Sequence, residues 1–495
     1  MRLTSLLARA AVLPVDPVEA DPEIRGVQVD SRRVRQGDLF AALRGARADG
    51  AVFVTDALKR GAAAVLAETA KPEGLPSTIA WVRVPDARRG VGLLAREWHG
   101  RPDLAMTLVG ITGTNGKTTV SYLVESIAKA AGRNAGRIGT TGAAYAGLEI
   151  PSANTTPEAT ELFALLARMR DAGTRLVAME VSSHALALHR VVGARFAVAA
   201  FLNLGRDHLD FHGTPEAYFE AKASLFDRLG ADDTAVLPAD DPLGATLARR
   251  TRGRVVTWGR GEGADIRLRN EAFDLDGGRG TIESPWGSAR VETPLVGRFN
   301  LDNALAAAAC AFVAGLPPAA VERGIASLAV VPGRLERVEV GQPFTVLVDY
   351  AHTPEALELA LAAVRAARPR RLGVVFGCGG ERDRGKRPRM GRAAASAADA
   401  VWLTSDNPRS EDPLAILDEA RAGVLEVPGG AERTRVEPDR ARAIVAALDW
   451  AREGDAVVIA GKGHETTQSF GDRTVPFDDR EHAREALAAA GWRVR

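Results

Sequence analysis

Apolar residues in the middle of the chain gather in short continuous runs separated by longer amphipathic stretches. The clearest runs are TLVGIT (107–112), RLVAMEV (175–181) and AVAAFLNL (197–204). Runs of this kind are typical of strands that are buried on both faces of a parallel sheet, and helical stretches lie between them. Residues 101–335 are therefore predicted to form a βαβ domain with a mostly parallel sheet.

The two flanking segments repeat this alternation with a different texture. Residues 1–100 carry shorter strand-like runs (GVQVD, AAVLAE and AWVRV), and the turn-rich stretch WHGRPDLA suits a linker to the middle of the chain. After VVPGRLERVE (330–339), which looks like a hinge, FTVLVDY, RLGVVFG, AVWLTSD and DAVVIAG alternate with amphipathic helices such as that at 354–367. We predict an α/β protein of three domains, at 1–100, 101–335 and 336–495, the last of them Rossmann-like.

Composition narrows the class of protein. The chain has 495 residues, with 46% hydrophobic and 26% charged residues, which is typical of a globular protein with about three domains. The net charge of +1 gives no field that would favour nucleic acid or a membrane surface. No run approaches the roughly 18 apolar residues of a membrane span, and Arg9 interrupts the first apolar run, which predicts an amphipathic helix and no signal peptide. The two cysteines, Cys310 and Cys378, form no disulfide framework, so we expect a cytoplasmic protein.

A glycine-rich loop, GITGTNGKTT (110–119), follows the strand TLVGIT and opens a helix. Strand, loop and helix in this order are what a phosphate cradle requires. Lys117 would neutralise the β- and γ-phosphates of a nucleotide, and Thr118 would offer its hydroxyl to Mg²⁺. The strict Walker pattern fails at Ile111, where a glycine is required, and the alternative is a chance glycine-rich turn.

Two further motifs lie where neighbouring strands end. Glu180 closes RLVAMEV, and His208 comes just beyond AVAAFLNL. Because the carboxyl ends of parallel strands share one edge of a sheet, Glu180, His208 and Thr118 are predicted to converge on Mg²⁺. Taken alone, His208 is better explained as a structural histidine. Lys222, four residues after Tyr218 on a predicted helix, reads by itself as a solvated lysine.

The last predicted sheet brings three polar loops to one edge: GCGGERDRGKR, DNPR (406–409) and GKGHE (461–465). Arg382 and Arg409 suit carboxylates, and Asp406 and Glu465 suit ammonium groups. A ligand with two carboxylates and two amines fits this mixture. The alternatives are a charged surface loop, a proline-terminated turn and a glycine-rich bend.

Taken together, the motifs resemble the Mur ligases, in order and over nearly the whole chain. The motifs that carry the resemblance are GITGTNGKTT, NTTP (154–157), MEVSSHALALHR, NLGRDHLDFHG, AYFEAKASLF, VGRFNLDNALAA, PGRLERV, DYAHTPEAL, GCGGERDRGKRPRMG, DNPR and AGKGHE. The resemblance implies an ADP-forming carboxylate–amine ligase that works through an acyl phosphate in peptidoglycan precursor synthesis. The implied reaction adds meso-diaminopimelate to UDP-N-acetylmuramoyl-L-alanyl-D-glutamate (UDP-MurNAc-dipeptide), with ATP as co-substrate and Mg²⁺ as cofactor, on a monomeric enzyme. A lysine-adding Mur ligase, a folylpolyglutamate synthetase and a catalytically silent binding protein are the alternatives.

The resemblance also implies roles for individual residues. Domain 1–100 would bind the UDP-MurNAc moiety, domain 101–335 would bind ATP, and domain 336–495 would bind the amino acid. The catalytic group would be Lys117, Glu180, His208 and Lys222, with Lys222 carbamoylated and joining Thr118, Glu180 and His208 as metal ligands. ATP would contact Gly113, Thr114, Asn115, Gly116, Lys117, Thr118, Thr119, Asn300, Asn303, Arg334 and Asp349. The muramoyl-peptide would contact Ser31, Asn154, Thr155, Thr156, Ser182 and Arg190. Diaminopimelate would contact Arg382, Asp406, Asn407, Pro408, Arg409, Gly461 and Glu465.

Some of these positions have a simpler interpretation. Asn300 and Asn303 are also placed to cap the helix that contains NALAAAACAFV. Some relatives carry a His-Gln pair in the loop where this chain has GARADG, so Ala46 and Arg47 receive no assigned uridine contact.

Overall fold

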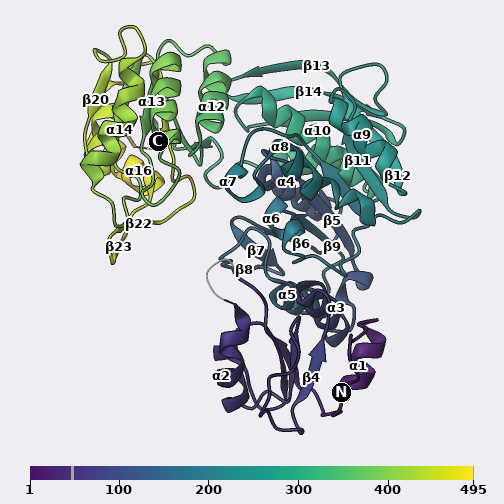
Figure 1. Ribbon diagram of the computed structural model, residues 1–495. Helices are drawn as coiled ribbons and strands as arrows, with labels where there is room; N and C mark the ends of the chain where they lie inside the picture. Colours follow the sequence, from purple (N-terminus) through teal and green to yellow (C-terminus); the bar gives the residue numbers. More distant parts are fainter. Residues whose placement is uncertain (46–48, 494–495) are drawn as a thin grey trace. The chain divides into compact units, whose positions relative to one another are not determined.

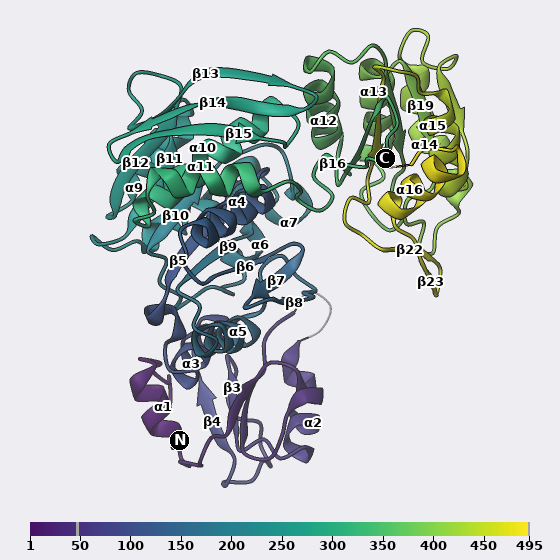
Figure 2. The same cartoon turned by 180° about the vertical axis from the view of Figure 1, so that it is seen from behind.

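The computed structural model describes residues 1–45 and 49–493, and Ala46 and Arg47 lie outside this range. The described chain divides into two compact units (Figures 1 and 2). The first comprises residues 1–266 and 306–320, and the second comprises residues 267–305 and 321–495. The predicted α/β class is confirmed, whereas the boundaries of the three domains stay a prediction.

The first unit begins with a four-stranded parallel sheet in the order β1 (Gly26–Gln28), β2 (Asp38–Ala41), β3 (Ala64–Ala67) and β4 (Ala80–Arg83). Alternate strand residues point to opposite faces. Leu39 and Leu66 pack with helices α1 (Leu3–Arg9) and α3 (Ala87–Trp98), whereas Phe40 and Val65 pack with α2 (Val54–Lys59). The short apolar runs are therefore strands sandwiched between helices (Figure 1).

The central sheet of the first unit follows in the order β12-β11-β10-β5-β9-β6-β7-β8. Its strands are β5 (Thr107–Thr112), β6 (Ala135–Gly139), β7 (Gly142–Tyr145), β8 (Leu148–Ile150), β9 (Leu176–Glu180), β10 (Val198–Phe201), β11 (Thr234–Pro238) and β12 (Arg254–Gly259). The pairs β6–β7 and β7–β8 are antiparallel and the other described pairs of these strands are parallel, so the loops after β5, β9 and β10 meet at one edge. The helices between the strands are α4 (Lys117–Ala130), α5 (Ala159–Asp171), α6 (Ser183–Ala187), α7 (Leu209–His212), α8 (Pro215–Ala223) and α9 (Pro242–Arg250).

An antiparallel meander follows that sequence reasoning did not predict. It consists of β13 (Ile266–Asp274), β14 (Gly277–Ser284) and β15 (Gly287–Thr293), joined by tight turns. Its sequence alternates apolar and polar residues, as in IRLRNEAFD, which is the pattern of a sheet with one solvated face. Helices α10 (Arg298–Val313) and α11 (Pro318–Ser327) come next, and the division between the units passes through both.

The rest of the second unit is a six-stranded sheet in the order β16-β17-β21-β18-β19-β20. Its strands are β16 (Glu336–Arg337), β17 (Thr345–Asp349), β18 (Leu372–Phe376), β19 (Ala400–Leu403), β20 (Thr434–Val436) and β21 (Ala456–Ala460), and β22 (Thr467–Phe470) and β23 (Arg473–Pro476) form a separate hairpin. One face packs on α12 (Pro354–Ala366), α13 (Lys386–Ala397) and α14 (Pro413–Leu425), and the other packs on α15 (Arg440–Trp450) and α16 (Asp479–Ala489). The hinge-like segment 330–339 therefore contains a short strand, β16.

Close packing of α13 on α14 depends on two glycines. A Cβ at Gly391 would lie 2.0 Å from the Ala420 carbonyl oxygen, and a Cβ at Gly423 would lie 1.7 Å from that of Pro388. This contact fixes the start of α13, which directly follows the loop GCGGERDRG. Among the helices of the described residues, none combines the length and the apolar character that crossing a membrane would require.

Candidate active site

The predicted phosphate loop joins β5 to α4, which begins at Lys117. Gly116 has a φ of 89°, a left-handed conformation that favours glycine, and it turns the chain into the helix. The Lys117 side chain lies back over the loop, and its Nζ donates to the carbonyl oxygens of Gly113 and Thr114, both at 2.9 Å. Thr118, in the first turn of α4, is buried. The loop thus presents a lysine and a helix N-terminus together, as phosphate binding requires.

Lys222 is fully enclosed, so its interpretation as a solvated lysine is wrong. Only 1% of the residue is exposed, and its Nζ donates to the Gly113 carbonyl oxygen at 3.0 Å. The ammonium lies 4.3 Å from the centre of the Tyr218 ring, whose hydroxyl is 3.1 Å from Thr114 Oγ1. Burial, reinforced by the charge of Lys117, holds the pKa of Lys222 well below its usual value. Helix α8 therefore delivers a second lysine to the carbonyl that Lys117 already contacts.

Glu180 and His208 lie at the ends of β9 and just after β10, as predicted. Glu180 is 1% exposed, and its carboxylate accepts hydrogen bonds from the Thr140 amide at 2.9 Å and the Thr140 hydroxyl at 3.1 Å. His208 has a φ of 53°, and its ring centre lies 4.6 Å from that of His184. Burial lowers the pKa of His208, although Asp207 opposes the shift, and a lower pKa favours the neutral ring that a metal ligand requires.

These side chains fit a cation only in part. Glu180 supplies a carboxylate, Thr118 supplies a hydroxyl and His208 supplies a neutral ring nitrogen. In residues 1–45 and 49–493, no three histidine, cysteine or acidic side chains are grouped so as to hold a metal. A hard cation prefers oxygen ligands, and a carbamate on Lys222 would add the anionic group that the set otherwise lacks.

The residues expected to hold the muramoyl-peptide gather around the end of β9. Thr156 Oγ1 donates to the Glu180 carbonyl oxygen at 2.8 Å and accepts from the Ser182 amide at 3.1 Å. Arg190 donates to the Thr156 carbonyl oxygen at 3.1 Å, and the Thr155 hydroxyl is 3.1 Å from that of Thr140. The structure thus brings together most of the residues predicted to hold the muramoyl-peptide, from segments about 30 residues apart.

Asn154 and Ser31 complete this predicted set. Asn154 belongs to the same turn, and its carbonyl oxygen accepts from the Ser152 hydroxyl at 2.7 Å. Ser31 lies elsewhere, buried at the start of a short 3₁₀ helix (Ser31–Arg33) that the Asp30 side chain caps. The contacts of these residues with a substrate stay a prediction.

The remaining predicted ATP contacts lie in the second unit. Asn300 and Asn303 are buried in the first turns of α10, where Asn303 Nδ2 donates to Asn300 Oδ1 at 2.9 Å and Asn300 Nδ2 donates to the Val296 carbonyl oxygen at 2.8 Å. Asp349, at the end of β17, accepts from the amides of Leu335 and Ala351 at 2.7 and 2.8 Å. Burial raises the pKa of Asp349, with Arg334 opposing the shift.

The three polar loops of the second unit meet at the carboxyl ends of β18, β19 and β21, as predicted. Arg409 Nη1 donates to the Gly380 carbonyl oxygen at 2.6 Å, which ties DNPR to the loop that carries the exposed Arg382. Asn407 Nδ2 donates to Glu465 Oε2 at 3.0 Å, which ties DNPR to GKGHE. Gly461, which opens GKGHE, has a φ of 115°. Pro408, between Asn407 and Arg409, is buried.

Two buried cations of this edge were missed by sequence reasoning. Lys462 is 0% exposed, and its Nζ lies 3.2 Å from both Asn407 Oδ1 and Glu465 Oε2 and 3.6 Å from Asp406 Oδ1. Arg387 is also 0% exposed and donates to carboxylate oxygens of Glu411 and Glu419 at 2.8–3.0 Å. The only signal in the sequence was their presence in two charged motifs, GKGHE and GERDRGKR.

The chain matches known proteins along most of its length. Residues 23–99 match the Mur ligase family catalytic domain, residues 111–311 match the Mur ligase middle domain, and residues 333–463 match the Mur ligase glutamate ligase domain. A protein of Solibacter usitatus named UDP-N-acetylmuramoyl-L-alanyl-D-glutamate–2,6-diaminopimelate ligase is 48% identical over 97% of this chain and 96% of its own length. A protein of the same name from Gloeobacter violaceus is 46% identical over 99% of this chain and 98% of its own.

A solved structure agrees with these matches. A protein described as UDP-N-acetylmuramoyl-L-alanyl-D-glutamate–2,6-diaminopimelate ligase superposes with a TM-score of 0.69 at 35% identity, over 94% of this chain and 95% of that one. Family matches, full-length relatives and fold therefore agree with the motifs at the two sheet edges, and the chain belongs to the Mur ligase family.

Proposed function

We propose that this protein is a cytoplasmic, monomeric ATP-dependent ligase that adds meso-diaminopimelate to UDP-N-acetylmuramoyl-L-alanyl-D-glutamate in peptidoglycan precursor synthesis. The near full-length similarity to a relative named for 2,6-diaminopimelate, at 48% identity, carries this proposal. In it, residues 1–100 bind the UDP-MurNAc moiety, residues 101–335 bind ATP, and residues 336–495 bind the amino acid.

The reaction has two steps. An oxygen of the D-glutamate side-chain carboxylate attacks the γ-phosphorus of ATP, and the bond from that phosphorus to ADP breaks, which leaves an acyl phosphate. The amine of diaminopimelate then attacks the acyl carbon, loses a proton, and expels inorganic phosphate as the C–N bond forms. The first step brings two anions together, so the chain must supply positive charge at the phosphates.

Lys117 is the residue that supplies this charge. Its ammonium lies at the loop between β5 and α4 and donates to two carbonyl oxygens of that loop. Mg²⁺ bound through Thr118, Glu180, His208 and the modified Lys222 would supply further positive charge. Asn300, Asn303, Arg334 and Asp349 would hold the rest of ATP, and Asn154, Thr155, Thr156, Ser182, Arg190 and Ser31 would hold the peptide substrate.

Lys222 is proposed to carry a carbamate. Its neutral amine would attack CO₂ and release one proton, which yields an N-carboxylate. A lowered pKa favours the neutral amine that this reaction needs, and the nearby Lys117 charge would stabilise the anion that forms. The modification would place a negative charge on the buried Lys222, next to the positive charge of Lys117.

The carbamate has a direct test. Protein exchanged into ¹³C-bicarbonate should show a carbamate signal by ¹³C NMR that is absent from Lys222→Ala and retained in Lys129→Ala, a control on the exposed face of α4. Activity lost in Lys222→Ala should return in part when a small carboxylate such as acetate is added. A wild-type spectrum without the signal, in an active preparation, would refute the assignment.

The proposed activity is tested by phosphate release. Purified protein with Mg²⁺ and ATP should release phosphate rapidly only when both UDP-MurNAc-dipeptide and diaminopimelate are present. Equal rates with lysine would make the protein a ligase of different specificity. Release that depends on neither substrate, or no release at all, would contradict the proposed function.

A further inference from the structure

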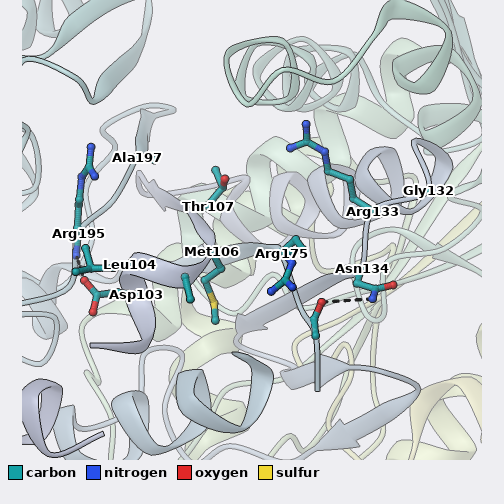
Figure 3. A pocket seen from close by; sticks show the side chains of 12 residues that line it. Asp103, Leu104, Met106, Thr107, Gly132, Arg133, Asn134, Arg175, Arg195 and Ala197 are labelled. Atoms are coloured by element: carbon teal, nitrogen blue, oxygen red, sulfur yellow. Dashed lines mark hydrogen bonds between the residues drawn. The ribbon is translucent and has the colours of Figure 1, made fainter. Parts of the chain in front are cut away.

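A hollow of about 800 Å³ opens in the first unit, away from the phosphate loop (Figure 3). Its polar lining comes from the segments that precede four strands of the central sheet. The polar residues among those that line it are Asp103, Thr107, Arg133, Asn134, Arg175 and Arg195. A volume in this range is typical of sites for small molecules.

This hollow lies at the opposite edge of the sheet from the phosphate loop. Thr107, the first residue of β5, lines the hollow, whereas the phosphate loop follows Thr112, the last residue of the same strand. Arg175 and Ala197 likewise come just before β9 and β10. Six residues of extended strand span roughly 20 Å, so a ligand in the hollow would not touch the reacting groups.

The side chains that line the hollow carry more positive than negative charge. Its one carboxylate, Asp103, is already engaged, because it accepts from Arg96 at 2.8–3.1 Å and from the Arg195 amide at 3.1 Å. Arg195 in turn pairs with Asp233 at 2.9 Å. These four side chains therefore offset one another.

Two arginines of the lining lie outside these ion pairs. In the described part of the chain, neither Arg133 nor Arg175 pairs with a carboxylate. Arg133 Nη1 donates to the Ala314 carbonyl oxygen at 3.1 Å, which holds that side chain in place. Arg175 is exposed, and Figure 3 shows its guanidinium near the centre of the view, below those of Arg133 and Arg195.

The simplest alternative is that these arginines only offset the negative ends of helix dipoles. Helices α4 and α5 end at Ala130 and Asp171, next to Gly132 and Gly173 of the lining. Each helix C-terminus is equivalent to roughly half a negative charge. Two such ends amount to about one charge, against two unpaired guanidinium groups, and Arg175 directly precedes a strand. The hollow therefore keeps a net positive character.

We propose that this hollow binds a small anion that carries a di- or triphosphate. Guanidinium groups bind phosphate oxygens in bidentate fashion, and two unpaired ones favour a ligand with at least two negative charges. The lining adds the amide of Asn134 and the hydroxyl of Thr107 as further hydrogen-bonding groups. Such a site would bind its ligand independently of the substrates of the ligase reaction.

Isothermal titration calorimetry with tripolyphosphate tests the proposal. The full chain is used in magnesium-free buffer, and a titration of Lys117→Ala identifies the binding that belongs to the phosphate loop. The binding that Lys117→Ala retains should be one equivalent of tripolyphosphate, and adding Arg175→Ala should weaken this binding by about 10- to 100-fold, as expected for the loss of one charge-assisted contact.

The controls separate a built site from general attraction to a charged surface. Arg484→Ala removes an exposed arginine of α16 and should bind as wild type does. Arg133→Ala should weaken binding as Arg175→Ala does, and thermal melting of both variants shows whether they remain folded. Absence of saturable binding to wild type, or equal affinities in wild type, Arg175→Ala and Arg484→Ala, would overturn the proposal.

Discussion

Replacement of Arg409 by alanine should collapse the discrimination between diaminopimelate and lysine. The two amino acids differ by one distal carboxylate, so selectivity requires a group that binds that carboxylate favourably. Arg409 is half-buried at the end of β19, and its Nη1 is fixed to the Gly380 carbonyl oxygen at 2.6 Å. The remaining nitrogens of the guanidinium are free to form the bidentate pair that a carboxylate prefers.

The expected magnitude follows from this geometry. Truncating one partner of a buried, hydrogen-bonded charge pair costs about 2–5 kcal/mol. Because Arg409 is only half-buried, we expect the lower part of this range, about 2–3 kcal/mol, or roughly 30- to 150-fold in kcat/KM for diaminopimelate. The φ of 53° at this position strains arginine and alanine alike, so the substitution should not alter the backbone.

Steady-state phosphate release, with ATP and UDP-MurNAc-dipeptide saturating, measures both amino acids in the same variant. Arg409→Ala should lose activity with diaminopimelate and keep its KM for ATP and for the precursor. Arg484→Ala, an exposed arginine of the same unit, should behave as wild type. Arg382 is the alternative residue for binding the distal carboxylate. If the preference for diaminopimelate over lysine survives in Arg409→Ala but is lost in Arg382→Ala, the reasoning is refuted.

Three further predictions follow. Lys117→Ala should abolish ATP turnover without changing the circular dichroism spectrum, because its Nζ donates to two carbonyl oxygens of the phosphate loop and belongs to no apolar core; normal phosphate release would contradict this. Arg387→Met should lower the free energy of unfolding in urea by about 2–4 kcal/mol, since Glu411 and Glu419 lose a fully buried partner, and an unchanged midpoint would count against it. Burial, with Arg334 and Arg480 nearby, lowers the pKa of His464 to about 4, so the unfolded chain binds a proton between pH 4 and 6.5 that the folded chain does not. Stability should therefore fall as the pH is lowered through this window, and His464→Gln should remove on the order of 2 kcal/mol of that fall, measured as urea midpoints at several pH values.

Continuous apolar runs made the parallel sheets predictable from the sequence. TLVGIT coincides with β5 residue for residue, and the runs RLVAMEV and AVWLTSD contain β9 and β19. Because parallel strands end at one edge, this was enough to place Glu180 and His208 at the same edge and to gather DNPR and GKGHE. The expectation that their strands are neighbours was wrong, because β5 lies between β9 and β10. The meander β13–β15 was not predicted, because its alternating pattern is that of a sheet with one solvated face and differs from the continuous apolar runs around it.

The environment of a single charged side chain was harder to predict. By itself, Lys222 reads as a solvated lysine in the sequence, and Lys462 was not singled out. Both are buried against partners more than 50 residues away, Gly113 and Asn407. Local periodicity carries no information about such partners. The paired positions of Thr140 with Glu180 and of Arg387 with Glu419 required the folded chain for the same reason.

A competition experiment tests the central claim most directly. The protein is incubated with ATP, Mg²⁺, UDP-MurNAc-dipeptide and equal concentrations of diaminopimelate and lysine. The masses of the nucleotide products are then measured by mass spectrometry. The proposed function predicts that nearly all product has gained one diaminopimelate residue and that one ADP forms per product. A product that has gained lysine, or ADP formation without a larger nucleotide product, would contradict it.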